Sequence, residues 1–383
     1  MLRYWLLALV TMSPLLSKIA LGQTLSQNET VFSQTMKAPS QKSKHHFSWS
    51  TSILGMNSLN QSEQRQLIDF RLRLKGDSEL SSWLGLNFEA GLRMQNGNSQ
   101  TLNSSDNNQN RVVLEQAALQ ITPHKSLIVS AGALSMRTTH SPLAIDSMPF
   151  PAARLTHKHI WSPQFYTALF VESAIPTNAT LATDTEEFEK TPSLNTIGFM
   201  TRSLWGQQGE FKARASFAQW KNLAGNVASK SGFLGNSISP VTEEIAAFDY
   251  DYSVYDLGML VNIDVANSIS MGLFGEGLYN QSAPESMNQA YQVGAQLGLH
   301  LGSTDYLIKG FGYRIEPDAT VAYYGPTVLF NTNRIGYGAE LELDFKNFSV
   351  ITRYTEAELL FEDPDQSREK SVFVKLETDY ADF

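Results

Sequence analysis

Cysteine is absent from the 383 residues of this chain, and a long apolar run occurs only near the N-terminus. A protein of this size without disulfide bridges must draw its stability from its architecture. Beyond the first 22 residues, no apolar stretch reaches the ~20 residues that a transmembrane helix needs. Basic residues are also few, with 29 Lys and Arg against 38 Asp and Glu, and the net charge of −9 disfavours nucleic acid as a partner.

The first 22 residues have the three parts of a secretory signal peptide. Arg3 supplies a positive start, an apolar run follows at 4–16, and small residues at 20–22 suit a signal peptidase. We expect residues 1–22 to be cleaved, which removes two basic residues and changes the net charge from −9 to −11. Residues 23–45 are polar and aperiodic, and we expect them to form a polar leader before the folded part.

Charged and apolar residues alternate strictly in the segment QLIDFRLRLKG, where Arg71 and Arg73 stand between Phe70, Leu72 and Leu74. A β-strand sends successive side chains to opposite faces, so this segment would have one charged face and one apolar face. Similar alternation recurs in the segments 84–94, 211–217, 255–264, 291–301 and 335–345. Period two, repeated along the chain, predicts β-strands.

Short and long connections alternate between the predicted strands. We expect short turns at 76–79, 122–126, 161–163, 206–209, 266–268, 302–304 and 346–347. We expect long polar loops at 57–62, 95–110, 136–152, 174–191, 221–249, 280–288, 316–332 and 361–370. These seven turns and eight loops imply sixteen strands, of which the strand at 153–160 has the weakest pattern.

A membrane barrel explains this alternation of connections, whereas a soluble β-sandwich would show no consistent asymmetry of loop length. Strands of about 12 residues extend ~40 Å, and a tilt of about 45° leaves ~28 Å across the bilayer. Unpaired strand edges cannot be hydrated in hydrocarbon, so the sheet must close on itself. We therefore predict an all-β fold, a transmembrane antiparallel up-and-down β-barrel of sixteen strands over residues 46–383.

The last segment, SVFVKLETDYADF, resembles the C-terminal strand of Gram-negative outer-membrane proteins. Alternate residues from Val372 to Tyr380 are expected to face outward, and the chain ends in Phe383, which is out of phase with them. The resemblance implies that the barrel assembly machinery recognises Phe383. As a whole, residues 46–383 resemble the sixteen-stranded general porins in architecture and loop pattern.

The resemblance to general porins implies that the third extracellular loop folds into the barrel and narrows the pore. In that family, acidic residues on this loop face basic residues on the wall. Here the third long loop, 136–152, carries Arg137, His140 and a single carboxylate, Asp146. The resemblance also implies an integral protein of the outer membrane that contacts lipid and lipopolysaccharide, and a homotrimer.

The inward faces of the predicted strands carry charges of both signs. The candidate pore-lining residues are Arg65, Arg71, Arg73, Arg93, Lys212 and Arg214 on basic strands, Glu340, Glu342 and Asp344 on an acidic strand, and Arg137, His140 and Asp146 on the loop. Because the last strand closes on the first, an acidic wall should meet a basic wall near the seam. Charged walls decide what an aqueous pore passes. Alternatively, these charges only pair with one another and keep the lumen hydrated.

The function that these patterns favour is passive diffusion of small hydrophilic solutes and ions through a porin, with no enzymatic activity, cofactor or metal. One alternative is a barrel enzyme of the lipase or protease type, which needs a Ser/His pair oriented by a third group. Another is a structural or adhesive barrel with a closed lumen, which the long loop 221–249 would suit. His157 and His159 could chelate a metal from one strand, but polar pore or rim residues are the more common meaning of such a pair.

Overall fold

The computed structural model describes residues 45–382, except 61–63, 99–109, 147, 177–189, 206–208, 242–245 and 364–365. Sixteen long strands form the wall: β1 (His45–Asn60), β2 (Gln64–Ser81), β3 (Leu84–Asn98), β4 (Asn110–His124), β5 (Leu127–Ser135), β6 (Pro149–Ser162), β7 (Phe165–Ala174), β8 (Ser193–Leu204), β9 (Gly209–Lys221), β12 (Ser253–Ala266), β13 (Ile269–Asn280), β14 (Gln289–Leu301), β15 (Thr304–Ile315), β16 (Arg334–Asp344), β17 (Phe348–Leu359) and β18 (Glu369–Thr378).

Shorter elements lie between these strands and at the C-terminus. They are the 3-10 turns η3 (Met136–Thr138), η4 (Ala322–Tyr324) and η5 (Thr327–Leu329), the helix α2 (Gly225–Gly232), the hairpin β10 (Ile238–Pro240) with β11 (Ala246–Phe248), and β19 (Ala381–Asp382). In the described parts of the chain, no helix is long and apolar enough to cross a lipid bilayer.

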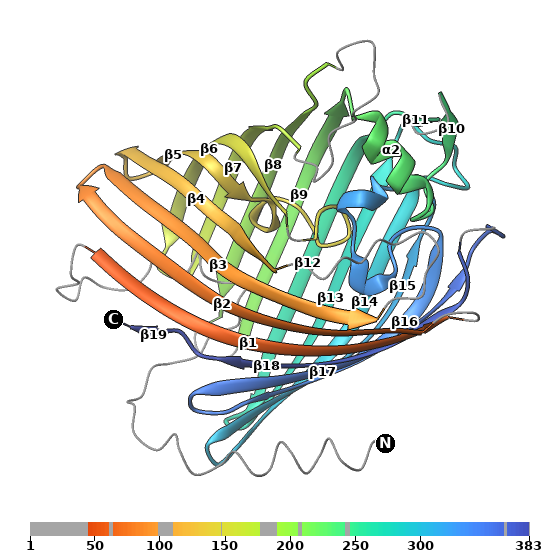
Figure 1. The fold of residues 1–383 in the computed structure, drawn as a ribbon. Helices are drawn as coiled ribbons and strands as arrows, with labels where there is room; N and C mark the ends of the chain where they lie inside the picture. Colours follow the sequence, from red (N-terminus) through yellow and green to blue (C-terminus); the bar gives the residue numbers. More distant parts are fainter. Residues whose placement is uncertain are drawn as a thin grey trace.

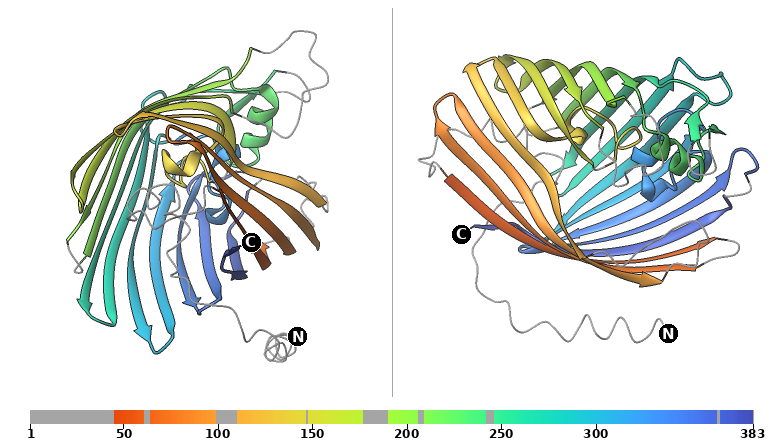
Figure 2. Two further views of the ribbon diagram at one scale, coloured as in Figure 1. Left: turned by 90° about the vertical axis from the view of Figure 1, so that its left-hand side faces the viewer. Right: turned by 45° about the horizontal axis from the view of Figure 1, so that its top comes forward.

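The sheet closes into a barrel, as the sequence predicted (Figure 1). Each strand pairs antiparallel with its neighbour in the chain, and β9 pairs directly with β12 across the insertion that holds α2. β1 pairs with β2 on one side and with β18 on the other, where Ser52 lies opposite Glu377. Figure 2 shows the tilted strands from two further sides. Because the sheet is closed, the backbone N–H and C=O groups of every strand edge are hydrogen-bonded. This is necessary in hydrocarbon, where no water can bond to them.

The two faces of the wall differ in polarity because the strands alternate. Leu74, Leu92 and Leu257 are exposed on the outer face, whereas Arg73 and Asp256 are buried on the inner face. An arginine on the lipid-facing side at mid-bilayer would cost about 2–4 kcal/mol, so the apolar set must point outward. This two-sided wall explains why charged and apolar residues alternate in the sequence.

Most predicted connections are correct. The short turns lie at 82–83, 125–126, 163–164, 267–268, 302–303 and 346–347 and define one end of the barrel, the turn end. The long connections define the opposite loop end. The doubtful strand at 153–160 exists as β6, which pairs with β5 and β7. The predicted turn at 206–209 falls largely outside the described residues.

Two predicted connections are wrong. The turn expected at 76–79 is part of β2, which runs on to Ser81. Gly76 belongs to the ladder, where a Cβ would come within 2.2 Å of the Phe88 ring, so glycine here makes room for an aromatic neighbour. The connection expected to be long at 57–62 is short, because β1 continues to Asn60 and β2 begins at Gln64.

The C-terminal strand contains a one-residue shift that the alternation could not predict. Ser52 pairs with Glu377, whereas Ser48 pairs with Asp382, so the partner moves by one residue between β18 and β19. Tyr380 lies in this break, and its hydroxyl donates to Glu89 of β3 at 2.7 Å. The prediction that Tyr380 faces outward is therefore wrong, because the irregularity reverses the phase of the strand. Phe383 lies outside the described residues.

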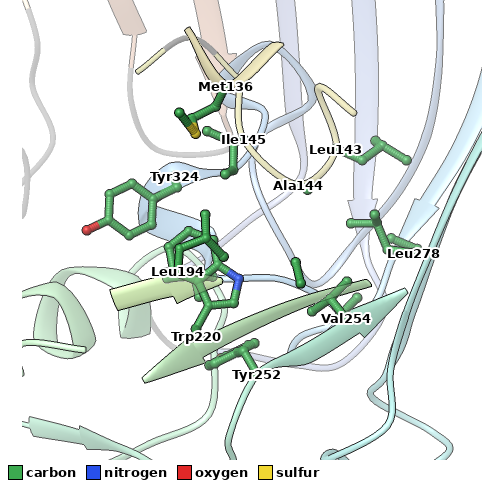
Figure 3. Close-up of a cluster of buried hydrophobic side chains, with 14 of the residues drawn as sticks. Met136, Leu143, Ala144, Ile145, Leu194, Trp220, Tyr252, Val254, Leu278 and Tyr324 are labelled. Atoms are coloured by element: carbon green, nitrogen blue, oxygen red, sulfur yellow. The ribbon is translucent and has the colours of Figure 1, made fainter. Parts of the chain in front are cut away.

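A large apolar core lies at the loop end, which we call the loop core (Figure 3). Its strand residues include Trp220 and Val254, and its loop residues include Leu143, Ile145 and Tyr324. The rings of Trp220 and Tyr324 stack with centroids 5.2 Å apart and planes at 14°. Such a pair adds about 0.5–1.5 kcal/mol to the energy of burial, so the core joins the loops firmly to the wall.

Candidate functional site: the charged inner wall and the loop 136–148

Three of the predicted basic residues gather on β2 and β3. Arg71 and Arg93 are register partners, and both bind Asp69, at 3.0 Å and 2.5 Å between Nη2 and Oδ2. The Asp69 side chain is almost completely buried, whereas that of Arg71 is partly exposed. One carboxylate between two guanidinium groups leaves a net positive charge on this part of the wall.

Arg73, the third of these residues, reaches across β1 to bind Glu377 of β18. On β1, Ser50 lies opposite Arg73 and Ser52 lies opposite Glu377, and both serines are buried. Their small side chains leave room for the longer pair to meet above them. The expected contact between basic and acidic walls at the seam is thus made by a specific ion pair.

The aromatic ring of Tyr380 lies beside this seam. The Arg73 guanidinium and the Lys75 amine each lie 5.9 Å from the ring centroid, within the range of a cation–π interaction. Because the Tyr380 hydroxyl donates to Glu89, the ring connects basic and acidic groups of β2 and β3. Tyr380 was predicted to face outward, so this contact could not be expected from the sequence.

Glu115 is a charged residue of the inner wall that the sequence analysis missed. Glu89 pairs with Gln116 and the next residue, Ala90, pairs with Leu114, which leaves Glu115 as the extra residue of a β-bulge. A bulge redirects a side chain and breaks the period of two. Glu115 interacts electrostatically with Glu89 and with the guanidinium groups of Arg73, Arg71 and Arg137. The only sequence signal is the interrupted alternation in RVVLEQAALQ.

The loop 136–148 carries another basic candidate, Arg137. Its Nη2 lies 3.1 Å from Asp146 Oδ1, and its side chain is half exposed. Arg137 also interacts electrostatically with Glu115 of β4 and Lys375 of β18. The loop therefore places one exposed guanidinium near charges of the seam, while its single carboxylate compensates that guanidinium from within the loop.

The loop is attached to the wall by buried polar contacts. His140 Nε2 lies 3.5 Å from Glu172 Oε1 of β7, and both side chains are almost completely buried. The Ser141 amide donates to Asp256 Oδ2 of β12 at 2.7 Å. The Asp146 amide donates to the Tyr324 carbonyl at 2.9 Å. These contacts connect residues 136–146 to two distant strands and to the loop between β15 and β16.

The candidate residues of β9 are paired with carboxylates. Lys212 Nζ lies 3.0 Å from Glu210 Oε2, and Arg214 Nη2 lies 3.5 Å from Asp256 Oδ1. The guanidinium of Arg214 also lies 4.0 Å from Glu276 Oε1. The basic strand is therefore locally compensated rather than uniformly positive.

The acidic strand β16 is compensated in the same way. Glu340 binds Lys309 of β15 at 2.8 Å and Arg353 of β17 at 2.6 Å between Nε and Oε2. Glu342 lies 3.9 Å from the Lys309 amine. Asp344 lies near the turn end, where its register partner is Asp305. The acidic wall is thus interleaved with basic residues of its two neighbours, which the sequence analysis did not include.

The side chain of Arg65 lies outside the described part of the structure, although its backbone pairs with Ser58 in the β1–β2 ladder. His157 and His159 are exposed on the same face of β6 as Leu155, which is the outer face. They therefore do not line the lumen. Among the described residues, no group of three His, Asp or Glu side chains is placed to hold a metal ion.

No protein-family model and no curated protein matches the chain. Solved structures are similar in fold. The high-pH structure of Pseudomonas putida OprB is 12% identical, has a TM-score of 0.57 and is matched over 89% of this chain and 94% of its own. Its low-pH structure is 10% identical, with a TM-score of 0.50 and coverage of 87% and 92%. Acinetobacter baumannii OccAB4 is 9% identical, with a TM-score of 0.49 and coverage of 90% and 100%.

At these identities the similarity establishes the fold alone. The two OprB structures carry this conclusion, and the closed wall with its apolar outer face agrees with it. The chain folds as a porin-like β-barrel of sixteen strands.

Proposed function

We propose that this chain is an outer-membrane porin, a water-filled channel for passive diffusion of small hydrophilic solutes and ions. The observation that carries the proposal is the inner face of the closed wall, which bears charged side chains from β2, β3, β9, β16 and β18. Such a face needs water beside it, and barrels of 16–18 strands leave an aqueous channel. OprB, an outer-membrane porin, shares the fold.

The narrow part of this channel lies where the loop 136–148 approaches the seam. The loop contacts β7 and β12 through His140 and Ser141, and its exposed Arg137 interacts with Glu115 and Lys375, which supports a position inside the barrel. The loop itself contributes little net charge, because Asp146 compensates Arg137. Selectivity therefore depends on the charges of the wall and on where the Arg137 guanidinium stands.

The wall residues that act in selectivity are those with exposed charge near the loop. Arg71 and Arg93 share a single carboxylate, Asp69, and so add a net positive charge. Arg73 is neutralised by Glu377 and acts mainly in holding the seam. The candidates Lys212, Arg214, Glu340, Glu342 and Asp344 line the wider part of the lumen, together with the carboxylates and amines that compensate them.

The remaining features of the proposal concern export and assembly. Residues 1–22 are a cleaved signal peptide. The leader is residues 23–44, because β1 begins at His45. The barrel assembly machinery recognises Phe383. The porin is a homotrimer that contacts lipopolysaccharide. It is a channel and not a lipase or protease, a view supported by the likeness of its fold to porins.

Planar-bilayer recording tests the proposal directly. Purified protein added to one chamber should produce stepwise, long-lived current increments in KCl, and liposomes containing it should swell in small sugars faster than in large ones. Detergent alone is the control. If folded protein inserts but produces no increments and no swelling, the chain is a closed barrel with a structural or adhesive role. Release of fatty acid or peptide from added substrate would instead indicate the enzyme.

A further inference from the structure

We propose that Asp256 and Glu172 are positioning residues of the channel. They are buried carboxylates of the wall that fix the loop 136–146 and thereby decide where the Arg137 guanidinium stands in the solute path. The inference rests on the proposed function, because it concerns the narrow part of the same channel. Neither carboxylate belongs to the loop, so the loop sequence alone does not determine the aperture.

Asp256 holds the loop from β12. Its Oδ2 accepts the amide proton of Ser141 at 2.7 Å, and both residues are fully buried, at 1% and 0% exposure. Its other oxygen lies 3.5 Å from the Arg214 guanidinium, which orients the carboxylate. A hydrogen bond to an ionised acceptor is roughly twice as strong as a neutral one. Removing this acceptor would leave a buried amide without a partner, which is a costly arrangement.

Glu172 holds the loop from β7, on the other side. Its Oε2 accepts from Arg154 Nε at 2.5 Å, and its Oε1 lies 3.3 Å from the Thr139 hydroxyl and 3.5 Å from His140 Nε2. Arg154 in turn donates from Nη2 to the Ser135 carbonyl at 3.1 Å, just before the loop begins. Glu172 therefore fixes both the start of the loop and the residues that follow Arg137.

These two attachments are adjacent in the loop although they come from distant strands. Thr139 and His140 contact β7, and Ser141, the next residue, contacts β12. Arg137 precedes Thr139 by only two residues, so a shift at either attachment moves its guanidinium directly. The Ala144 carbonyl accepts from Thr320, which limits movement at the far end of the loop. The position of Arg137 consequently depends on Asp256 and Glu172.

A mutant cycle measures this coupling. Arg137→Gln removes a positive charge and should shift the reversal potential in a KCl gradient toward cations. In an Asp256→Ala background, most of that shift should disappear, because the loop, without its attachment to β12, no longer holds residue 137 in the path. Asp256→Asn removes the same charge but keeps an oxygen that can accept from Ser141, so the shift should persist. Glu172→Ala and Glu172→Gln form a second, independent pair.

Asp264→Ala is a further control for charge. Asp264 is exposed on β12, eight residues beyond Asp256, which at ~3.3 Å per residue places it ~26 Å along the strand toward the turn end. Its removal should leave the effect of Arg137→Gln unchanged. Heat-dependent migration on SDS gels confirms that each variant folds. If the Asp256→Ala barrel folds and the Arg137→Gln shift keeps its full size, Asp256 is not a positioning residue.

Cross-linking gives a readout that does not depend on current. The chain has no native cysteine, so Ser141→Cys with Asp256→Cys creates the only possible disulfide. It should form in the folded barrel and restore the full effect of Arg137→Gln, and reduction should remove that effect. A folded barrel in which the disulfide does not form would overturn the attachment. A disulfide that forms in a barrel without current would overturn the proposed function and leave the attachment standing.

Discussion

Exchanging the charges of Arg73 and Glu377 would show how far one ion pair holds the barrel closed. The pair crosses β1, and the two side chains are only 11% and 6% exposed. Neighbouring strands lie ~4.8 Å apart, so the backbones of β2 and β18 are separated by about 10 Å. Only long side chains can meet across that distance, and they do so above the buried Ser50 and Ser52.

The size of the effect follows from this burial. Arg73→Glu removes the cation and places a second carboxylate beside Glu377. Breaking a buried ion pair by changing one partner costs about 3–5 kcal/mol, and we expect a loss near the lower end because the site borders an aqueous lumen. Glu377→Arg should cost a similar amount, since it leaves Arg73 facing a second guanidinium. The double exchange restores opposite charges and should recover most of the loss, reduced by the Lys375 amine that now binds Glu377.

Urea unfolding in lipid vesicles, followed by tryptophan fluorescence, measures these free energies of unfolding. Asp264→Arg is the control, because it adds a cation at an exposed site. If the ion pair holds the seam, the double exchange is clearly more stable than the sum of the single changes predicts. If each single change costs less than about 1 kcal/mol, the pair behaves as a solvent-exposed salt bridge and does not hold the seam. The same conclusion would follow if the double exchange lost as much free energy of unfolding as the two single changes added together.

Three further predictions concern other parts of the barrel. Leu92→Arg puts a charge on the lipid-facing side and should destabilise the barrel by about 2–4 kcal/mol in urea titration, whereas Gln95→Arg, on the inner face of the same strand, should be nearly neutral. Arg71→Glu should shift the reversal potential toward cations. The shift should be largest at low salt, because the screening length falls from about 10 Å at 0.1 M to about 3 Å at 1 M. Equal shifts at both salt concentrations would contradict a direct effect of the charge. Burial in the loop core raises the pKa of Asp318, so its contribution to folding is present below its ordinary pKa and is lost as pH rises through the raised value. Proteolysis of the wild-type loops should therefore quicken across that interval while Asp318→Asn shows no such change, and parallel profiles would refute the assignment.

The strands were predictable because their signal is local. Alternation of apolar and charged residues over ten or so positions follows from the geometry of a strand that faces lipid on one side and water on the other. β6 was correctly predicted from the alternation of short and long connections, although its own residue pattern was weak. The turn at 76–79 was wrong because a glycine that makes room for Phe88 looks, in sequence, like a glycine that makes a turn.

The site was predictable only in part, because its residues are brought together by closure. Arg71, Arg73 and Arg93 were recognised as inward-facing, and Asp69 lies only two residues from Arg71. The partner of Arg73, Glu377, could not be chosen, because it lies hundreds of residues away in the chain. Glu115 was not predicted to face inward, because the β-bulge interrupts the alternation of inward and outward residues. Tyr380 was misplaced for the same reason, since one shifted residue turns an outward side chain inward.

The sequence by itself determined that the chain is a two-faced β-structure with sixteen strands and alternating turns and loops, since each strand carries its own polarity and length. Only the tertiary structure decided which charges compensate one another and where the loop 136–148 is attached. Asp256 and Ser141 are far apart in the chain, and no local pattern marks a carboxylate that will accept a loop amide. The physical reason is that such contacts depend on the register and curvature of a closed sheet, which are properties of all strands together.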